Sequence, residues 1–176
     1  MGEKNQEWQK PNQSFVNDIS AKLGEKNPTI KKAKAPTFVA ILETTSGGVI
    51  KLNESRFLTN VLREEAVKIL PSSLNYTIMT RENILAMLPP ETQIENCEGA
   101  CLVETGRNIS ANYVAQAQIS TFGSYLTISV ELYDTTSGKL ISSFNAKSIG
   151  VDNLELEIRR ESPKMFQEIL NLESLN

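Results

Sequence analysis

The two cysteines of the chain, Cys97 and Cys101, are the residues whose spacing most directly suggests chemistry. Four positions apart in an ideal helix, their Cα atoms would lie roughly 6 Å apart, which is within the range of a disulfide. A structural disulfide, two free buried thiols, a redox-active pair and part of a metal site all fit this spacing. A metal site would need further ligands, which in this chain could only be carboxylates such as Glu95, Glu98 or Glu104.

The 176-residue chain contains no histidine. This excludes Ser-His-Asp and Cys-His catalysis, histidine-ligated zinc or haem, and an imidazole pH switch. The net charge of −3 argues against a general nucleic-acid binder, whose affinity comes from neutralising phosphates. From the residues we assign no catalytic residue, no resident metal and no cofactor, and thiol chemistry at Cys97 and Cys101 stays open.

A glycine-containing segment, Ser46-Gly47-Gly48, lies between an apolar run and a helical pattern, where phosphate-binding loops occur. It lacks the glycine and lysine spacing of such loops, since Lys51 is not followed by Ser or Thr. A plain turn is the favoured interpretation.

Two pairs of neighbouring carboxylates could in principle supply acid–base chemistry. Glu64 and Glu65 lie in one helical pattern, and Glu155 and Glu157 lie in another. Both pairs are expected on exposed helix faces, so solvated charge is favoured over catalysis.

Three aromatic residues, Phe122, Tyr125 and Trp8, are candidate contact residues for a partner. Phe122 is the first residue of a predicted tight turn, Phe122-Gly123-Ser124, and Tyr125 follows directly after it. For Tyr125, packing against a residue of the neighbouring strand is the competing interpretation.

The first half of the sequence predicts two strands and three helices. A nearly continuous apolar run over 37–42 indicates a strand covered on both faces. A helix over about 54–70, with Asn53 as N-cap, carries an apolar stripe. A strand over 76–79 and a short helix follow, the helix capped by Thr80 and running through residue 88. A further helix should begin near residue 96 or 97 and reach about residue 108, with Ala100 and Val103 facing inward.

From residue 112 onward the hydrophobic period changes to two. Strands are predicted over 113–119, 126–133 and 140–146, and they form an antiparallel meander. The chain then ends in helix, first from Asp152 and again from Ser162, where Pro163 is expected to start a second helix. The resulting order is β-α-β-α-α-β-β-β-α. It predicts an α/β (α+β) fold with helices packed on a mixed sheet of about five strands.

Residues 1–36 differ in composition from the rest of the chain. They contain seven lysines against four acidic residues and few apolar ones. We expect an N-terminal tail or linker over 1–36, with one short helix over 15–23, and a single domain over 37–176. The sequence contains no apolar run long enough for a transmembrane helix.

Several blocks of the sequence resemble a recurrent bacterial envelope module. The main block runs from Cys97-Glu98-Gly99-Ala100-Cys101 to Ala111-Asn112-Tyr113-Val114, and a second covers Leu132-Tyr133-Asp134-Thr135-Thr136-Ser137-Gly138-Lys139-Leu140. The helix at 57–65 and the strand and helix at 76–88 also fit. These features resemble the TolB amino-terminal-domain-like group, which includes the curli-secretion protein CsgG and the lipoprotein activators of penicillin-binding proteins. The resemblance covers roughly residues 37–148.

The resemblance implies a non-enzymatic accessory or scaffold domain that is periplasmic or associated with the outer membrane. It implies a protein partner in the envelope, no nucleic acid, and membrane contact only through a removed signal or lipid anchor ahead of residues 1–36. It also favours a disulfide between Cys97 and Cys101, because the periplasm is oxidising. The chain carries no lipobox cysteine and no long amphipathic insertions of the kind that build the CsgG pore.

Two other functions and a second compartment fit the residues. Cys97 and Cys101 could serve a thiol–disulfide redox protein. A small ligand could occupy the crevice at the carboxyl ends of strands 37–42 and 76–79. The amino-terminal residues lack the apolar region of a signal peptide, which leaves a cytoplasmic location as the alternative.

Overall fold

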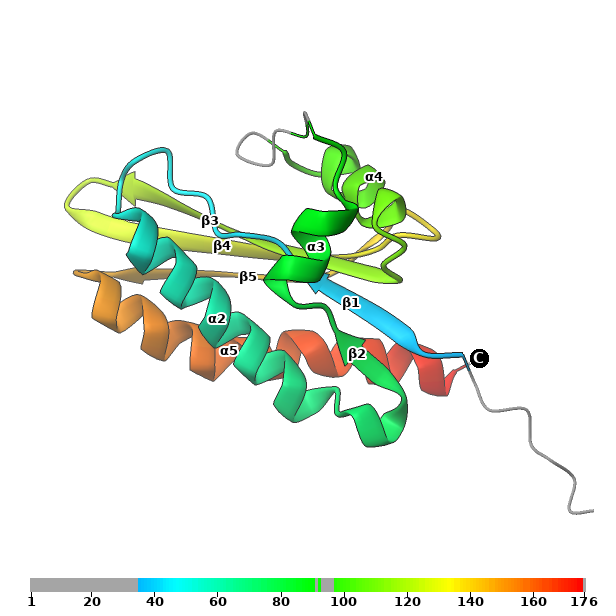
Figure 1. Cartoon of the computed structure of the whole chain (residues 1–176). Helices are drawn as coiled ribbons and strands as arrows, with labels where there is room; N and C mark the ends of the chain where they lie inside the picture. The colour runs from blue at the N-terminus through cyan, green and yellow to red at the C-terminus, as the bar shows by residue number, and fades with distance from the viewer. Residues whose placement is uncertain (1–34, 91, 93–96, 176) are drawn as a thin grey trace, which may run out of the picture. The chain divides into compact units, whose positions relative to one another are not determined.

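The computed structural model describes residues 35–90, 92 and 97–175, which form a mixed sheet with helices on both faces (Figure 1). The elements are β1 (Thr37–Ile41), α2 (Leu52–Ile69), the 3-10 helix η1 (Ser72–Leu74), β2 (Tyr76–Ile78), α3 (Arg81–Met87), α4 (Ala100–Asn108), β3 (Tyr113–Phe122), β4 (Tyr125–Asp134), β5 (Leu140–Ser148) and α5 (Val151–Ser174). The predicted fold class, five-stranded mixed sheet and element order are confirmed. The predicted helix over 15–23 lies outside the described residues.

The sheet has the strand order β2-β1-β3-β4-β5. β1 pairs in parallel with β2 on one side and with β3 on the other. The helix α2 connects β1 to β2 on one side of it. The helices α3 and α4 then connect β2 to β3, which lies on the other side of β1. Because such crossovers are right-handed, the two connections lie on opposite faces of the sheet.

Two hydrophobic cores follow from this arrangement, one on each face. Successive residues of β1 point to opposite sides, as expected for a strand covered on both faces. Val39 and Ile41 join the larger core beneath α2 and α5, whereas Ala40 and Leu42 join the smaller core that α3 and α4 help to cover. Figure 1 shows α2 and α5 together on one side of the sheet and α3 and α4 on the other.

The antiparallel half is a meander of β3, β4 and β5. A two-residue turn at Gly123 and Ser124 joins β3 to β4, and Phe122 pairs with Tyr125 across it. Gly123 has φ +62°, a conformation that glycine adopts without the steric cost of a side chain. The predicted alternation in β4 is confirmed, because Ile128, Val130 and Leu132 are all buried.

The helix α2 differs from its prediction at its start. It begins at Leu52, so Asn53 lies inside the helix and is not its N-cap. The Glu54 carboxylate instead accepts a hydrogen bond from the Lys51 backbone N–H at 2.7 Å, which satisfies an amide at the helix start.

The helix α4 also begins later than predicted. Gly99 has φ +53°, which is incompatible with a right-handed helix, so the helix starts at Ala100. Val103 is buried as predicted, but Ala100 is exposed, which corrects the expectation that it faces inward.

The prediction of a second C-terminal helix starting at Pro163 is wrong. α5 is one helix of 24 residues with Pro163 inside it. The buried residues Leu154, Ile158, Ser162, Met165, Phe166 and Ile169 form one continuous stripe at helical spacing. Packing along this stripe outweighs the single backbone hydrogen bond that proline removes.

Candidate interaction site

Three exposed apolar side chains lie at the turn end of the β3–β4–β5 meander. Phe122 of β3 pairs with Tyr125 of β4, and they are 64% and 44% exposed. Ile149, which is 80% exposed, directly follows β5, whose last residue Ser148 pairs with Leu126 at the same end. We call Phe122, Tyr125 and Ile149 the hairpin patch.

The hairpin patch borders a polar part of the sheet. On the side away from α2 and α5, the residues of β4 and β5 nearest to the patch are mostly polar. We call this surface the open face, and it comprises Thr127, Ser129, Ser143, Asn145 and Lys147. Lys147 lies over the Phe122 ring, with its Nζ 4.4 Å from the ring centroid. The cation–π contact joins the open face to the hairpin patch.

The predicted contact residues are thus partly brought together. The structure places Phe122 and Tyr125 side by side. Tyr125 pairs with a residue of the neighbouring strand, and because it is also exposed, its contact with a partner stays a prediction. Trp8 lies outside the described residues. Ile149 was missed by the sequence analysis, although an apolar residue directly after a strand of alternating pattern is a signal that could have found it.

Cys97 and Cys101 are joined by a disulfide, with their Cα atoms 5.2 Å apart. Cys97 precedes α4 and is 2% exposed, while Cys101 lies in its first turn and is exposed. The Cys97 sulfur also lies 3.5 Å from the Thr105 hydroxyl oxygen. The bridge therefore fixes the segment before α4 against the helix.

Glu98 and Glu104, two of the carboxylates proposed as further metal ligands, do not form a metal-binding group with the cysteines. Within the described ranges, no group of three or more Cys, Asp or Glu side chains is placed to hold a metal ion. Glu98 instead accepts a hydrogen bond from the Gln118 side chain at 2.9 Å, and Glu95 lies outside the described residues.

A polar pocket of about 430 Å³ lies beside the disulfide, lined partly by Glu98, Gln118, Glu131 and Tyr133. Burial raises the pKa of Tyr133 to about 12, and the hydrogen bond that its hydroxyl donates to Glu131 at 2.8 Å adds to this effect. Tyr133 is therefore a neutral hydrogen-bond donor at neutral pH.

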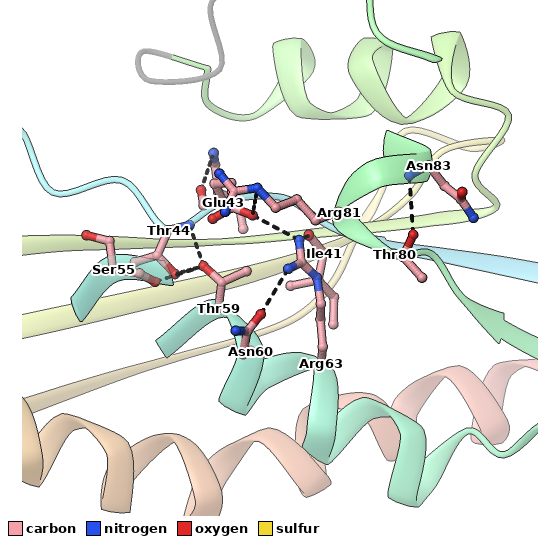
Figure 2. A network of polar contacts seen from close by, with 11 residues as sticks. Ile41, Glu43, Thr44, Ser55, Thr59, Asn60, Arg63, Thr80, Arg81 and Asn83 are labelled. Carbon is pink, nitrogen blue, oxygen red and sulfur yellow. Dashed lines mark hydrogen bonds and ion pairs between the residues drawn. The ribbon is translucent and has the colours of Figure 1, made fainter. Parts of the chain in front are cut away.

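A second cluster of polar residues lies at the carboxyl end of β1 (Figure 2). Arg63 donates hydrogen bonds to the Ile41 carbonyl at 2.8 Å and to the Glu43 carboxylate at 3.2 Å. Arg81 lies 3.6 Å from the same carboxylate. Arg63 belongs to α2 and Arg81 to α3. The two helices, which lie on opposite faces of the sheet, thus both contact Glu43.

The segment Ser46-Gly47-Gly48 forms the predicted turn, because the Val49 N–H donates to the Ser46 carbonyl at 2.9 Å. It lines a pocket of about 590 Å³ together with Ser55, Arg56 and Arg81. This pocket lies at the carboxyl end of β1. In the sheet, β1 lies between β2 and β3, which the chain reaches through crossovers on opposite faces. It is the place where the sequence analysis expected a small-ligand crevice.

The carboxylate pairs are only partly exposed, which corrects the prediction for Glu65. Glu65 is 5% exposed and its carboxylate lies 2.9 Å from Arg159. Arg159 also pairs with Glu64 at 3.1 Å and with Glu155 at 2.9 Å. These carboxylates thus serve the contact between α2 and α5.

Neither a protein-family model nor a curated protein sequence matches the chain. Solved structures similar to it include the C-terminal domain of LpoB from Salmonella enterica, at 16% identity and a TM-score of 0.46, over 75% of this chain and 93% of that one. TolB from Acinetobacter baumannii is similar at 17% identity and a TM-score of 0.43, over 78% of this chain and 29% of TolB. The PelC dodecamer from Paraburkholderia phytofirmans is similar at 10% identity and a TM-score of 0.44, over 73% of this chain and 86% of that one. The similar structures therefore include TolB, which gives its name to the group that the sequence resembles.

Proposed function

We propose that this chain is a non-enzymatic protein-interaction domain of the bacterial envelope, which docks a protein partner through the hairpin patch. The observation that carries the proposal is the cross-strand pair of exposed aromatic side chains, Phe122 and Tyr125, with the exposed Ile149 directly after β5 at the same end of the meander. Exposed clusters of this kind mark interaction sites, and aromatic residues are enriched among the residues that dominate binding energy.

The disulfide supports the envelope as the compartment. Disulfides persist in oxidising environments such as the periplasm and are rare in the cytosol. In the part of the chain that the structure describes, no helix is both long and apolar enough to cross a membrane.

The proposal is tested by capture from an envelope extract with the immobilised full chain. The double variant Phe122→Ser/Tyr125→Ser should lose the captured envelope protein while remaining folded, because both side chains are exposed. Phe57→Ser is the matched control, since Phe57 is an aromatic residue of α2 with 49% exposure. Capture of cytosolic proteins alone, or equal capture by the double variant, would contradict the proposal.

A second candidate function is small-ligand binding in the pocket at the carboxyl end of β1. Arg56 and Arg81 line this pocket together with the backbone of Gly47 and Gly48, a combination that suits an anionic ligand. Thermal-shift screening with inorganic phosphate and short dicarboxylates tests it. The expected stabilisation should disappear in an Arg56→Gln/Arg81→Gln variant.

The redox alternative is tested by insulin reduction. A thiol–disulfide oxidoreductase needs an accessible, activated thiol. Only Cys101 is exposed, and its bridge to the buried Cys97 fixes the segment before α4, which favours a structural role for the pair. We expect no reduction of insulin above the uncatalysed rate.

A further inference from the structure

The turn between β3 and β4 determines which backbone groups of β5 point away from the sheet. Across a two-residue turn the flanking residues, here Phe122 and Tyr125, form a hydrogen-bonded pair. Hydrogen-bonded and non-hydrogen-bonded pairs alternate along an antiparallel ladder. Even-numbered residues of β4 such as Ile128 and Val130 therefore direct their N–H and C=O groups toward β5.

The register of β4 with β5 carries this pattern to the edge of the sheet. Ile128 pairs with Ala146 and Val130 pairs with Phe144, so these β5 residues bond inward. The residues between them and beside them, Ser143, Asn145 and Lys147, direct their N–H and C=O groups outward. β5 is the last strand in the sheet order, and no described strand pairs with its outer edge.

The side chains of β5 are polar on one face of the sheet and apolar on the other. This difference determines which side chains a neighbouring strand would need on each face. On the open face, Ser143, Asn145 and Lys147 are exposed and polar. On the helix side, Phe144 and Ala146 are only partly buried, although they pack against the larger core. An added strand would complete their burial with its own apolar residues.

The charge of β5 distinguishes between two candidates for pairing with its outer edge, which are β5 of a second copy of the chain and an acidic segment of another protein. Lys139 and Lys147 lie near its two ends, and neither makes an ion pair within the described part of the chain. Residues 139–148 contain no Asp or Glu, so β5 of a second copy would bring further lysines and no carboxylate. Exposed lysines on edge strands oppose such self-pairing. A segment with acidic residues is complementary.

We propose that the outer edge of β5 binds an extended segment of a partner protein as a sixth strand. The segment alternates apolar residues, which face Phe144 and Ala146, with acidic or small polar residues, which face Ser143, Asn145 and Lys147. The inference rests on the proposed function for the existence of a protein partner, and it names the chemistry of that partner. Main-chain hydrogen bonds supply the affinity of such strand addition, and alternate side chains supply the specificity.

Amide-resolved NMR of the full chain with a designed peptide tests the inference. The probe is acetyl-Thr-Val-Glu-Val-Asp-Val-Thr-amide, and its control replaces both acidic residues by lysine. At about 1 mM peptide and low salt, the acidic peptide should slow hydrogen exchange at Ser143, Asn145 and Lys147. Phe144 and Ala146 should change little, because their amides already bond to β4. The lysine peptide should leave all these amides unchanged.

Substitutions in β5 separate strand addition from other modes of binding. Ser143→Pro removes an outward N–H at an edge position, where proline is tolerated, and should weaken peptide binding by at least about fivefold. Ser143→Ala keeps that N–H and should bind as the original does. Lys147→Glu should reverse the preference between the two peptides. No protection at the three outward amides, or equal binding by Ser143→Pro, would overturn the inference.

The two proposals fail in different experiments. Capture of an envelope protein that depends on Phe122 and Tyr125 but survives Ser143→Pro would overturn strand addition alone. Binding of the acidic peptide at β5, without any capture that depends on the hairpin patch, would contradict the proposed function and support the edge as a peptide site.

Discussion

Among single residues, the Thr59 hydroxyl links the segment that follows β1 to α2. The Thr59 side chain accepts a hydrogen bond from the Thr44 backbone N–H at 2.9 Å and lies 2.8 Å from the Thr44 hydroxyl oxygen. It also donates to the Ser55 carbonyl at 3.0 Å (Figure 2). Thr59 is fully buried, so these contacts satisfy groups that water cannot reach.

Thr59→Val should lower the free energy of unfolding by about 1–3 kcal/mol, because it leaves the buried Thr44 N–H without its acceptor. Urea unfolding followed by circular dichroism measures this change. Thr59→Ser keeps the hydroxyl and should cost clearly less. Equal losses in both variants would show that the methyl group, and not the hydrogen bonds, accounts for the effect.

Removing the disulfide should destabilise the domain modestly. The bridge closes a loop across a sequence separation of four, so its loss should cost about 2 kcal/mol through the entropy of the unfolded chain. Urea unfolding with and without dithiothreitol measures this. A Cys97→Ala/Cys101→Ala variant serves as control and should be insensitive to the reductant. A reductant effect that persists in this variant would contradict the assignment.

At the scale of elements, the distance between α4 and the sheet depends on a glycine. A Cβ atom placed on Gly106 would lie 2.6 Å from the Thr135 methyl carbon and 3.0 Å from the Val114 Cβ. The helix can therefore pack against β3 only because this residue has no side chain.

Gly106→Ala should lower the free energy of unfolding by about 1–3 kcal/mol through overpacking. Gly150→Ala is the matched control, since a Cβ there meets nothing within 4 Å and the backbone has no positive φ. Differential scanning calorimetry measures both variants. If Gly106→Ala and Gly150→Ala shift the melting temperature equally, the close packing of α4 against β3 does not explain the need for glycine at position 106.

Pro163 in the middle of α5 belongs to the same scale. Pro163→Ala should raise the free energy of unfolding by about 1–3 kcal/mol, because it restores a backbone hydrogen bond and relieves the clash with the preceding turn. Chemical denaturation measures the gain. A loss of stability would instead support a helix that starts at this residue.

At the scale of the whole molecule, ion pairs join segments that are distant in sequence. Arg159 of α5 bonds to Glu64 and Glu65 of α2, about half the chain length away. Hydrogen bonds from Lys68 and Arg159 hold the pKa of Glu64 below its ordinary value of 4.5. The ionised form is therefore favoured in the folded state.

The sign of the resulting pH dependence follows from that lowered pKa. The contribution of Glu64 to stability is fully present above pH 4.5 and is lost as the pH falls through its folded-state pKa. Glu64→Gln should therefore be less stable than the original at pH 7 and equally stable near pH 2. Glu168→Gln, on an exposed part of α5, is the control and should follow the original at both pH values. A constant difference between Glu64→Gln and the original would contradict this account.

Much of the fold was predictable because its signals are local. The period-two pattern of β4 and the Thr80 cap of α3 each depend on residues close in sequence, and both are confirmed; the Thr80 hydroxyl accepts from the Asn83 N–H at 3.2 Å. Asn53 and Pro163 were misassigned because their local preferences were outweighed, at Asn53 by the Glu54 carboxylate and at Pro163 by packing along all of α5.

Residue types and short-range periodicity are enough to predict the order of strands and helices along the chain, the two faces of the meander and the exclusion of histidine chemistry. Which residues meet depends on long-range packing. The fold pairs Phe122 with Tyr125, buries Glu65 against Arg159, and leaves the outer edge of β5 without a partner among the described strands. The physical reason is that strand register and crossover bring distant segments together, and side-chain exposure is settled by those long-range contacts.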